Sequence, residues 1–520
     1  MLISPRGKGK GVFLVCMFVF VLGTLENVGF VANMVTMVLY FKIVMHFDLS
    51  ASSNTLTNFM GSVWLLPLLG GFISDTFLNR LQTWSDIWNI GSTGFNKSLH
   101  PDPCRKSSCV KGGKAAMFYA SLCLLAVGSG GVQGSLPALG ADQFDRKDQK
   151  GGKLLASYFN WYLLNTTIGS MVEVTVVVWV SMNRDWYWGF LIGTVTAVVG
   201  FIFLAIGNPF YCFQPLGSSP IVKIAQVIVA AIRNRRLSIP TSPDELYEID
   251  DEDGDPSEEK IPHTSQFRSL DKAAILLEGM TPKPWKACTV TQVEEVNILT
   301  RMLPIIGSTI IMNTCMAQLQ TFSVHQGYFM DPYICSFKFP ISAIPVIPLF
   351  FMSLLIPIYE FLVVPFARKI NGHPSGITQL QRVGVGLVLS IISMAVAAIV
   401  EVKRRNHAHR NPLQPLSLFW LSFQYGIFGI ADMFTIVGLM EFFYKEAPSG
   451  MRSLSTSFTY LSLSFGYFLS SIFVDLINSI TKKITPSKQG WLHGNNLNLF
   501  YWFLAILSTL NLAIYLYCAS

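Results

Sequence analysis

The stretch ITQLQRVGVGLVLSIISMAVAAIVEV, residues 377–402, decides the fold class of this chain. Within it, residues 383–400 form a run without any charged side chain. A helix that crosses a bilayer needs about 20 mostly apolar residues, because the membrane interior offers no water to satisfy backbone amides. The stretch therefore predicts one membrane-spanning helix.

Comparable apolar stretches recur along the whole chain. Its 520 residues are 51% hydrophobic and only 13% charged, and its mean hydropathy is +0.44. A single water-soluble core cannot bury so large an apolar fraction. About eleven spans are predicted, at roughly residues 12–41, 54–78, 114–138, 154–180, 187–212, 302–325, 337–364, 377–402, 415–443, 453–479 and 498–518. The chain is therefore expected to be an all-α membrane protein.

A polar interval divides the spans into two groups. We predict an N-terminal helical bundle over 1–212, a cytoplasmic linker over 213–300 and a C-terminal helical bundle over 301–520. The acidic run Asp244–Lys260 combines dense like charge with few aromatic residues, which predicts a solvated, partly disordered segment. Residues 223–236, KIAQVIVAAIRNRR, alternate apolar and basic positions at helical spacing, which predicts a helix on the cytoplasmic surface.

The basic residues of the chain follow the pattern of a membrane topology. The net charge of +7 comes from short loops between spans and not from one continuous basic surface, so nucleic-acid binding is not indicated. Arg6, Lys8 and Lys10 precede the first span, and the positive-inside rule therefore puts the N-terminus in the cytoplasm. The first apolar run is long enough to stay as a span, and no cleaved secretory signal is evident.

Several motifs point to one family. The loop GFISDTFLNR after the second span places Gly71, Asp75 and Arg80 at the spacing of the major facilitator loop motif, where a carboxylate and a guanidinium can bridge helices and separate again. Six further blocks follow in order: GADQFD (140–145), SYFNWYLLN (157–165), FRSLDKAAI (267–275), TVTQVEEV (289–296), GITQLQRVGVG (376–386) and EFFYKEAPSGMRS (441–453). With them the chain closely resembles the plant nitrate and peptide transporter family, a branch of the proton-coupled oligopeptide transporters.

The resemblance implies a major facilitator fold, in which twelve spans form two bundles that rock around a midplane substrate site. It also implies a proton-coupled symporter of small anionic or zwitterionic solutes, in the plasma membrane or another plant membrane such as the vacuolar one. Family members carry nitrate, di- and tripeptides, hormones such as abscisic acid and gibberellins, and glucosinolates. The implied partners are the solute, protons and the bilayer, and the proton gradient, without a cofactor, is the driving force.

The proton-coupling residues of the family are only partly present. In the first span the family has two Glu three apart followed by a basic residue, whereas the matching stretch GTLEN has Gly23, Glu26 and Asn27 at these positions. In the tenth span Asp432 stands where the family has a cavity-facing Glu. A carboxylate inside an apolar run is a functional candidate by default, and we therefore predict Glu26 and Asp432 as proton carriers. A protonated, structural Glu26 is the alternative.

Neutral side chains replace the family's cations in the substrate site. Gln133 stands where the resemblance implies a Lys, and Met316 stands where one branch has a nitrate-binding His, so nitrate is not the expected main substrate. The predicted substrate-cavity residues are Asn33, Gln133, Tyr162, Gln318, Gln320 and Tyr425. Contacts between helices are an equally good interpretation of the two Gln residues of the seventh span, and packing is the alternative for each aromatic ring.

One expected crossing departs from the family. Residues 81–113 should contain the third span, yet Asp86, Lys97 and several other polar residues interrupt any apolar run there. Either this stretch crosses while shielded by neighbouring helices, or everything downstream is inverted. Cys104 and Cys109 lie in the same stretch and could form a disulfide in an oxidising compartment, and two free thiols are an equally good interpretation.

The combined features predict a secondary transporter of a small organic solute, such as a weak-acid hormone, a peptide or a related metabolite, by proton symport. A low-affinity nitrate transporter is one alternative. A non-transporting isoform that acts as a sensor or assembles with related transporters is another. An enzyme is not expected, because the sequence has no metal-spaced His and Cys cluster, no nucleophile elbow and no phosphate loop.

Overall fold

The structure is a computed structural model of the full chain. It describes residues 15–29, 49–76, 112–144, 149–184, 186–211, 220–238, 245–248, 260–276, 285–327, 329–334, 337–339, 341–371, 376–448, 451–484 and 496–519. Eight helices in these ranges are long and apolar enough to cross a membrane, and two shorter apolar helices cover Val15–Gly29 and Thr55–Leu69. The predicted all-α, multi-pass fold is confirmed.

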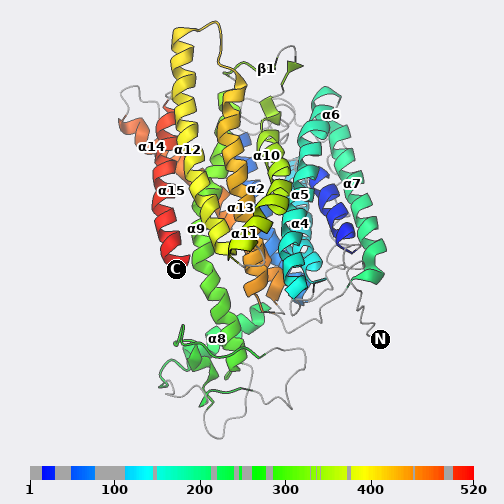
Figure 1. The fold of residues 1–520 in the computed structure, drawn as a ribbon, viewed down its shortest axis with the longest axis vertical. Coiled ribbons are helices and arrows are strands. Elements are labelled where there is room, and N and C mark those ends of the chain that lie inside the picture. Colours follow the sequence, from blue (N-terminus) through cyan, green and yellow to red (C-terminus); the bar gives the residue numbers. More distant parts are fainter. Residues whose placement is uncertain are drawn as a thin grey trace.

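Long helices make up nearly all of the described chain (Figure 1). The helices are α2 (Leu49–Thr76), α4 (Gly112–Ala141), α5 (Gln149–Val172), α6 (Val178–Asn183), α7 (Trp186–Gly207), α8 (Pro220–Arg233), α9 (Val290–Gly327), α10 (Val346–Ile358), α11 (Val364–Asn371), α12 (Gln379–Arg410), α13 (Leu421–Glu446), α14 (Arg452–Ile484) and α15 (Leu497–Ala519). Two π-helical turns, Glu173–Val177 and Tyr359–Val363, connect α5 with α6 and α10 with α11. The only strands in the described ranges, β1 (Tyr333–Ile334) and β2 (Phe337–Lys338), form a short antiparallel pair.

Local chemistry explains where the predicted helices begin. The helix predicted over 377–402 starts after a capping box, in which Thr378 and Gln381 exchange hydrogen bonds between side chain and backbone at 3.3 Å each. The span predicted over 337–364 starts later than expected, because β2 lies at its beginning and Pro345 occupies the N-cap of α10. Conversely, α9 starts at Val290, before the residue 301 at which the C-terminal bundle was expected to begin.

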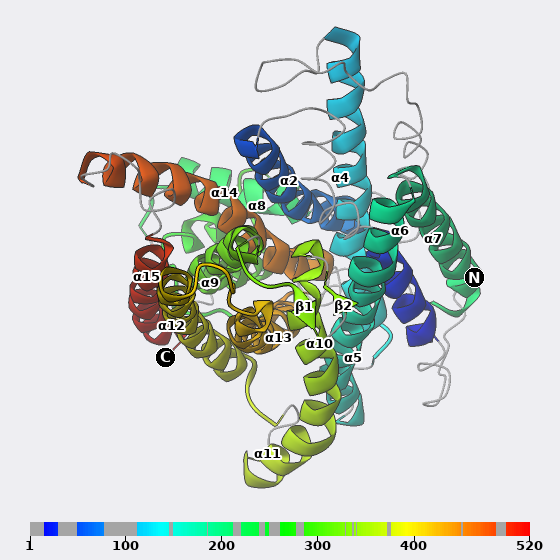
Figure 2. The ribbon, with the colours of Figure 1, turned by 90° about the horizontal axis from the view of Figure 1, so that it is seen from above.

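The helices form two bundles that meet along a central interface. Seen from above, α9, α12, α13 and α15 gather on one side, and α5, α6 and α7 lie on the other (Figure 2). Between them α14 packs against α2 and α4, while α10 and α13 pack against α5. One hydrophobic cluster lies within the second bundle, and another combines residues of both bundles. The bundles are therefore in contact in this structure.

The linker is ordered at its two flanks. The helix predicted over 223–236 is confirmed as α8, which packs against the foot of α9 at one end of the molecule, below the bundles in Figure 1. We call this end the linker end. Of the acidic run Asp244–Lys260, only residues 245–248 and 260 are described. Glu248 accepts hydrogen bonds from the Thr291 backbone N–H at 2.8 Å and from its hydroxyl at 2.9 Å, so the beginning of the acidic run caps α9.

The direction of α2 follows from its contacts with α14. Ser464 donates a hydrogen bond to the carbonyl of Gly61 at 2.6 Å, and Tyr460 stacks on Trp64 with ring centroids 5.7 Å apart. Residue numbers therefore rise along α2 where they fall along α14. The two helices are antiparallel.

Contacts with α14 also give the direction of α4. Arg452 at the start of α14 pairs with Asp142 just after α4 at 3.3 Å, and Ser457 donates to the carbonyl of Gly134 at 3.5 Å. The helix α4 is thus also antiparallel to α14 and runs parallel to α2. This arrangement argues against an inversion of the downstream helices. Residues 81–111, which carry the expected third span, lie outside the described residues.

Close packing of α14 against α9 generates a prediction about stability. A Cβ atom on Gly466 would lie 2.5 Å from Asn313 Cβ, whereas a Cβ atom on Gly307 of α9 would meet nothing within 4 Å. Gly466→Ala should destabilise the protein by about 1–3 kcal/mol through overpacking. Gly307→Ala is the matched control and should keep or raise stability, because Ala favours helix over Gly. Thermal unfolding in detergent measures both variants, and equal midpoints would contradict the packing described here.

Candidate functional site

Glu26 lies at the centre of a buried polar group in the first bundle. Only 6% of the residue is exposed. Its Oε1 atom accepts hydrogen bonds from Ser129 Oγ at 3.1 Å and Gln133 Nε2 at 3.5 Å, and its Oε2 atom accepts one from Asn27 Nδ2 at 3.2 Å. All of these partners are neutral. Within the described ranges no cationic side chain contacts Glu26, so an ionised carboxylate here would be uncompensated.

Gln133 and Gly23 lie around Glu26 at two of the three nearby positions that differ from the family pattern, and Asn27 is the third. The side-chain oxygen of Gln133 is buried and has no hydrogen-bond partner among the described residues, so it can accept a hydrogen bond from a bound solute. A Cβ atom on Gly23 would already lie 3.6 Å from the Tyr162 ring and 3.4 Å from Thr166. The rest of a Glu side chain would therefore compete with Tyr162 for space. The Tyr162 ring thus lies where the first Glu of the family motif would extend.

Aromatic rings connect Glu26 with the second bundle. Tyr162 of α5 is 5% exposed and lies beside Tyr460 of α14, which is within electrostatic reach of Glu26. Tyr460 in turn stacks on Trp64 of α2 with an interplanar angle of 6°. These rings provide flat apolar surface with hydroxyl groups at the interface of the bundles.

Asp432 belongs to a second polar group, on the other bundle. It lies on α13, is 8% exposed, and has no hydrogen bond or ion pair within the described ranges. It interacts electrostatically with Tyr467 of α14, whose hydroxyl donates to Gln320 Oε1 at 2.6 Å. Tyr460 and Tyr467 are seven residues apart on one helix face, so the two polar groups are separated by about 10 Å along the helix axis. Each bundle thus contains a buried carboxyl group, Glu26 or Asp432, that no cation contacts within the described ranges.

Other predicted cavity residues make contacts inside the second bundle. Gln318 is fully buried, and its Nε2 atom donates to Ser470 Oγ at 2.7 Å and to the Ser470 carbonyl at 3.0 Å, which is a helix-to-helix contact. Tyr425 donates to the carbonyl of Leu319 at 3.1 Å within the hydrophobic core. The structure brings Gln133, Tyr162 and Gln320 toward the bundle interface and places Gln318 and Tyr425 in packing positions.

The remaining predicted residues are not placed by the structure. Asn33, Arg80, Cys104 and Cys109 lie outside the described residues. Gly71 and Asp75 lie in the last turns of α2, at the end opposite to Leu49, and their side chains are not described. The loop-motif gate and the disulfide stay predictions.

A fully buried Arg382 joins the two bundles near the linker end. This residue of α12 is 1% exposed, and its Nη2 atom donates to Asn160 Oδ1 of α5 at 2.8 Å. Its Nη1 atom lies 3.4 Å from Glu441 Oε2 of α13, and its guanidinium stacks 4.8 Å above the Tyr359 ring. The Asn160 amide also donates to Glu360 Oε2 at 2.6 Å. Asn160 therefore connects the first bundle to Arg382 and Glu360 of the second.

A second polar connection lies beside the first. The Tyr444 hydroxyl of α13 donates to Asp142 Oδ1 at 2.6 Å, and Arg452 of α14 pairs with the same oxygen at 3.3 Å. The side chains of Tyr444 and Asp142 are almost completely buried. In this structure the two bundles are thus closed against each other near the linker end.

The sequence contains these connecting residues in the family blocks, but spacing alone assigns them no role. Asn160 lies in SYFNWYLLN, Arg382 in GITQLQRVGVG and Glu441 in EFFYKEAPSGMRS. The signal that could have found them is a charged or amide side chain inside an otherwise apolar helix. Glu360 has an additional signal, because it lies in a π-helical turn, a distortion frequent at functional sites.

Two helical bundles around buried carboxyl groups, closed at one end by polar contacts, have the architecture of a major facilitator transporter. A sequence profile of the POT family matches residues 81–492. The chain is 41% identical over 538 residues to protein NRT1/PTR family 4.5 of Arabidopsis thaliana, with 99% of this chain and 94% of the relative covered. It is 39% identical to NRT1/PTR family 4.6 of the same plant, with 98% and 94% covered. The chain belongs to the POT family.

Solved structures agree with this fold. The crystal structure of the POT family transporter PepTSo superposes with a TM-score of 0.68 at 17% identity, covering 96% of this chain and 97% of that chain. A POT family transporter in complex with 5-aminolevulinic acid superposes with a TM-score of 0.62 at 11% identity, covering 99% and 96%. The protein is therefore a membrane transporter of the secondary active type and not an enzyme, as predicted.

The connection through Asn160 generates a prediction about closure. Asn160→Ala removes the hydrogen bonds to Arg382 and Glu360 and leaves both charges in place, so the closed state should lose about 1–3 kcal/mol. Backbone hydrogen exchange in residues 157–165 and 379–386 should then become faster. Asn183→Ala is the matched control, because within the described ranges the Asn183 side chain bonds only its own helix, at Trp179 O. Unchanged exchange in Asn160→Ala would contradict a role of this contact in closure.

Proposed function

We propose that the protein is a proton symporter for small, weakly acidic organic solutes with substantial apolar surface. The carrying observation is that Glu26 in the first bundle and Asp432 in the second are buried carboxyl groups that no cation contacts in the described ranges. The bilayer and the proton gradient are then the only further requirements, and no cofactor takes part. We also infer that the linker end is cytoplasmic, because Arg6, Lys8 and Lys10 precede the first span. We infer that the plasma membrane is the site of action, as the family resemblance implies.

The proton-carrying role rests on the energetics of buried charge. An ionised carboxylate costs several kcal/mol away from water unless an opposite charge or several donors compensate it. Glu26 has only three neutral donors, and Asp432 has none within the described ranges. Binding a proton removes this cost. A bundle that exposes its carboxyl group to one side of the membrane and then buries it would therefore take up a proton on that side.

The substrate class follows from the groups around the two carboxyls. Tyr162, Tyr460 and Trp64 offer ring faces, and Gln133 offers a free acceptor. Met316, at the position of the nitrate-binding His, packs with Trp64 and Tyr467 in an apolar cluster. No cation among the described residues contacts these groups to hold a fixed anion such as nitrate. A solute that is neutral or becomes neutral with its proton fits this lining best.

Substitution of the carboxyl groups tests proton coupling. Glu26→Gln and Asp432→Asn should abolish accumulation driven by an inward proton gradient in proteoliposomes, while exchange of labelled for unlabelled solute continues. Asp475→Asn is the matched control, since Asp475 is an exposed carboxylate on α14. If both site variants accumulated solute as the control does, these residues would not be the proton carriers.

A charge introduced at Gln133 tests the substrate class. Gln133→Lys places a cation beside Glu26 and should shift preference toward fixed anions by about tenfold, the factor for ~1.5 kcal/mol of a charge-assisted hydrogen bond. Uptake of abscisic acid, gibberellin, a dipeptide and nitrate at two external pH values measures the preference. Gln414→Lys adds the same charge at an exposed position and should change nothing. Nitrate uptake by the wild-type protein at or above the level of the organic acids would contradict the proposal, and no uptake of any solute would favour a non-transporting isoform.

A further inference from the structure

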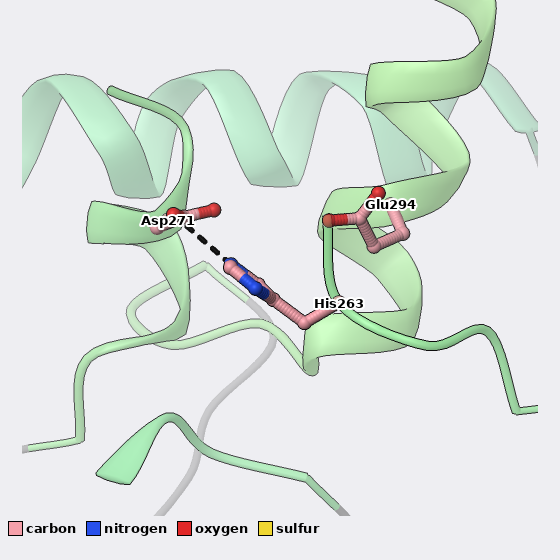
Figure 3. A group of neighbouring side chains, drawn as sticks. All are labelled: His263, Asp271 and Glu294. Atoms are coloured by element: carbon pink, nitrogen blue, oxygen red, sulfur yellow. Dashed lines mark hydrogen bonds and ion pairs between the residues drawn. The ribbon is translucent and has the colours of Figure 1, made fainter. Parts of the chain in front are cut away.

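Three potential metal ligands meet at the first turns of α9. In the sequence they lie far from Glu26 and Asp432, the carboxyl groups of the proposed transport site. One ligand atom each of His263, Asp271 and Glu294 lies within 4.8 Å of the others. Figure 3 shows the three side chains pointing toward one another, from the segment before the 3-10 turn, from the turn itself and from α9. The 3-10 turn covers Asp271–Ala274. Because the three residues are spread over three separate elements, their spacing in the sequence predicts no metal site.

The geometry around the cluster is well defined. His263 Nε2 lies 3.1 Å from Asp271 Oδ2. Glu294 accepts hydrogen bonds from the Thr264 backbone N–H at 2.8 Å and from the Thr264 hydroxyl at 2.9 Å, one on each carboxylate oxygen. These bonds fix the Glu294 carboxylate and leave further lone pairs on its oxygens, as in metal sites whose ligands are held by neighbouring groups.

One oxygen in the cluster has no hydrogen-bond partner among the described residues. Asp271 is 2% exposed, and its Oδ1 atom is buried without a hydrogen bond. Burial raises the pKa of Asp271, His263 opposes this shift, and the nearby Glu294 carboxylate adds to it. Two buried carboxylates thus share one imidazole and a more distant Arg268 as sources of positive charge. A buried polar atom that stays unsatisfied calls for an explanation such as an ion.

We propose that His263, Asp271 and Glu294 bind a divalent transition-metal ion of the Zn²⁺ type. Imidazole nitrogen is a good ligand for Zn²⁺ and a poor one for Mg²⁺ and Ca²⁺, while carboxylate oxygens neutralise the charge of either kind of ion. Three protein ligands of this type leave a fourth tetrahedral position for water. The side chain of His263 is 18% exposed, which gives the ion a path to solvent.

Bound metal would add to the polar contacts that already join the linker to the start of α9, such as Glu248 with Thr291 and Thr264 with Glu294. His263 and Asp271 belong to the linker, whereas Glu294 lies in the first turns of α9. A simple His263–Asp271 ion pair, with Glu294 bound to Thr264 alone, is the competing explanation, but it leaves Asp271 Oδ1 without a hydrogen bond among the described residues. The metal site accounts for all three groups and would fix the linker to the foot of a transport helix.

Metal retention by the purified full-length protein tests this proposal. The protein in detergent is incubated with ZnCl₂, passed through a desalting column and analysed by mass spectrometry for metal content. We expect one Zn²⁺ per chain in the wild-type protein and at least about tenfold weaker retention in His263→Gln and Asp271→Asn, which lack one ligand each. Glu248→Gln and His409→Gln are matched controls outside the cluster and should retain Zn²⁺ like the wild-type protein. Incubation with MgCl₂ should leave no retained metal.

X-ray absorption of the Zn²⁺-loaded wild-type protein provides a second readout that does not depend on the folding of any variant. We expect a shell of nitrogen and oxygen ligands with a single imidazole. A sulfur shell, or more than one imidazole, would show that Zn²⁺ binds elsewhere and would overturn the proposal. Absence of retained Zn²⁺ in the wild-type protein, or equal retention in folded His263→Gln, would overturn it as well.

Discussion

An ionised side chain buried away from water needs an opposite charge nearby, and this constraint sorts the buried ionisable groups of the protein. Arg382 satisfies it with Glu441, and Asp142 satisfies it with Arg452. These compensated groups hold the two bundles together near the linker end. Glu26 and Asp432 lack such partners among the described residues, so their charge state can follow the accessibility of the site. In the proposed function, the compensated charges between the bundles serve closure, and the uncompensated Glu26 and Asp432 serve proton transport.

The same constraint connects closure with the transport site. The helices α5, α13 and α14 each carry a residue of the closing contacts and a residue near the buried carboxyl groups. These pairs are Asn160 and Tyr162 on α5, Glu441 and Asp432 on α13, and Arg452 and Tyr460 on α14. Opening the linker end breaks the hydrogen bonds of Asn160 and moves the helices that surround the carboxyl groups. A rocking motion of the bundles would then expose Glu26 and Asp432 to the other side. In the proposed function, neutral Gln133 beside Glu26 leaves the proton, and not a fixed lysine, as the balancing charge.

The sequence predicts the helical membrane fold well, because runs such as 383–400 leave few other structures possible. It also indicates Glu26 and Asp432 as candidates, since a carboxylate inside an apolar span is conspicuous, and both carboxyl groups are buried in the structure. It does not predict that Gln318 and Tyr425 face helix partners while Gln320 contacts Tyr467, because the face of a helix that meets its neighbour depends on tertiary packing. The meeting of His263, Asp271 and Glu294 is equally invisible to spacing, since it depends on how the linker folds back onto α9.

The most direct test of the account measures proton movement with substrate in the wild-type protein. Proteoliposomes that contain a trapped pH-sensitive dye receive a transported weak acid without any imposed gradient, and protein-free liposomes correct for passive entry. The account predicts an internal acidification that saturates with substrate concentration and follows the rate of uptake. Saturable uptake of substrate without any change in internal pH would contradict the claim that the uncompensated carboxyl groups carry protons with the solute.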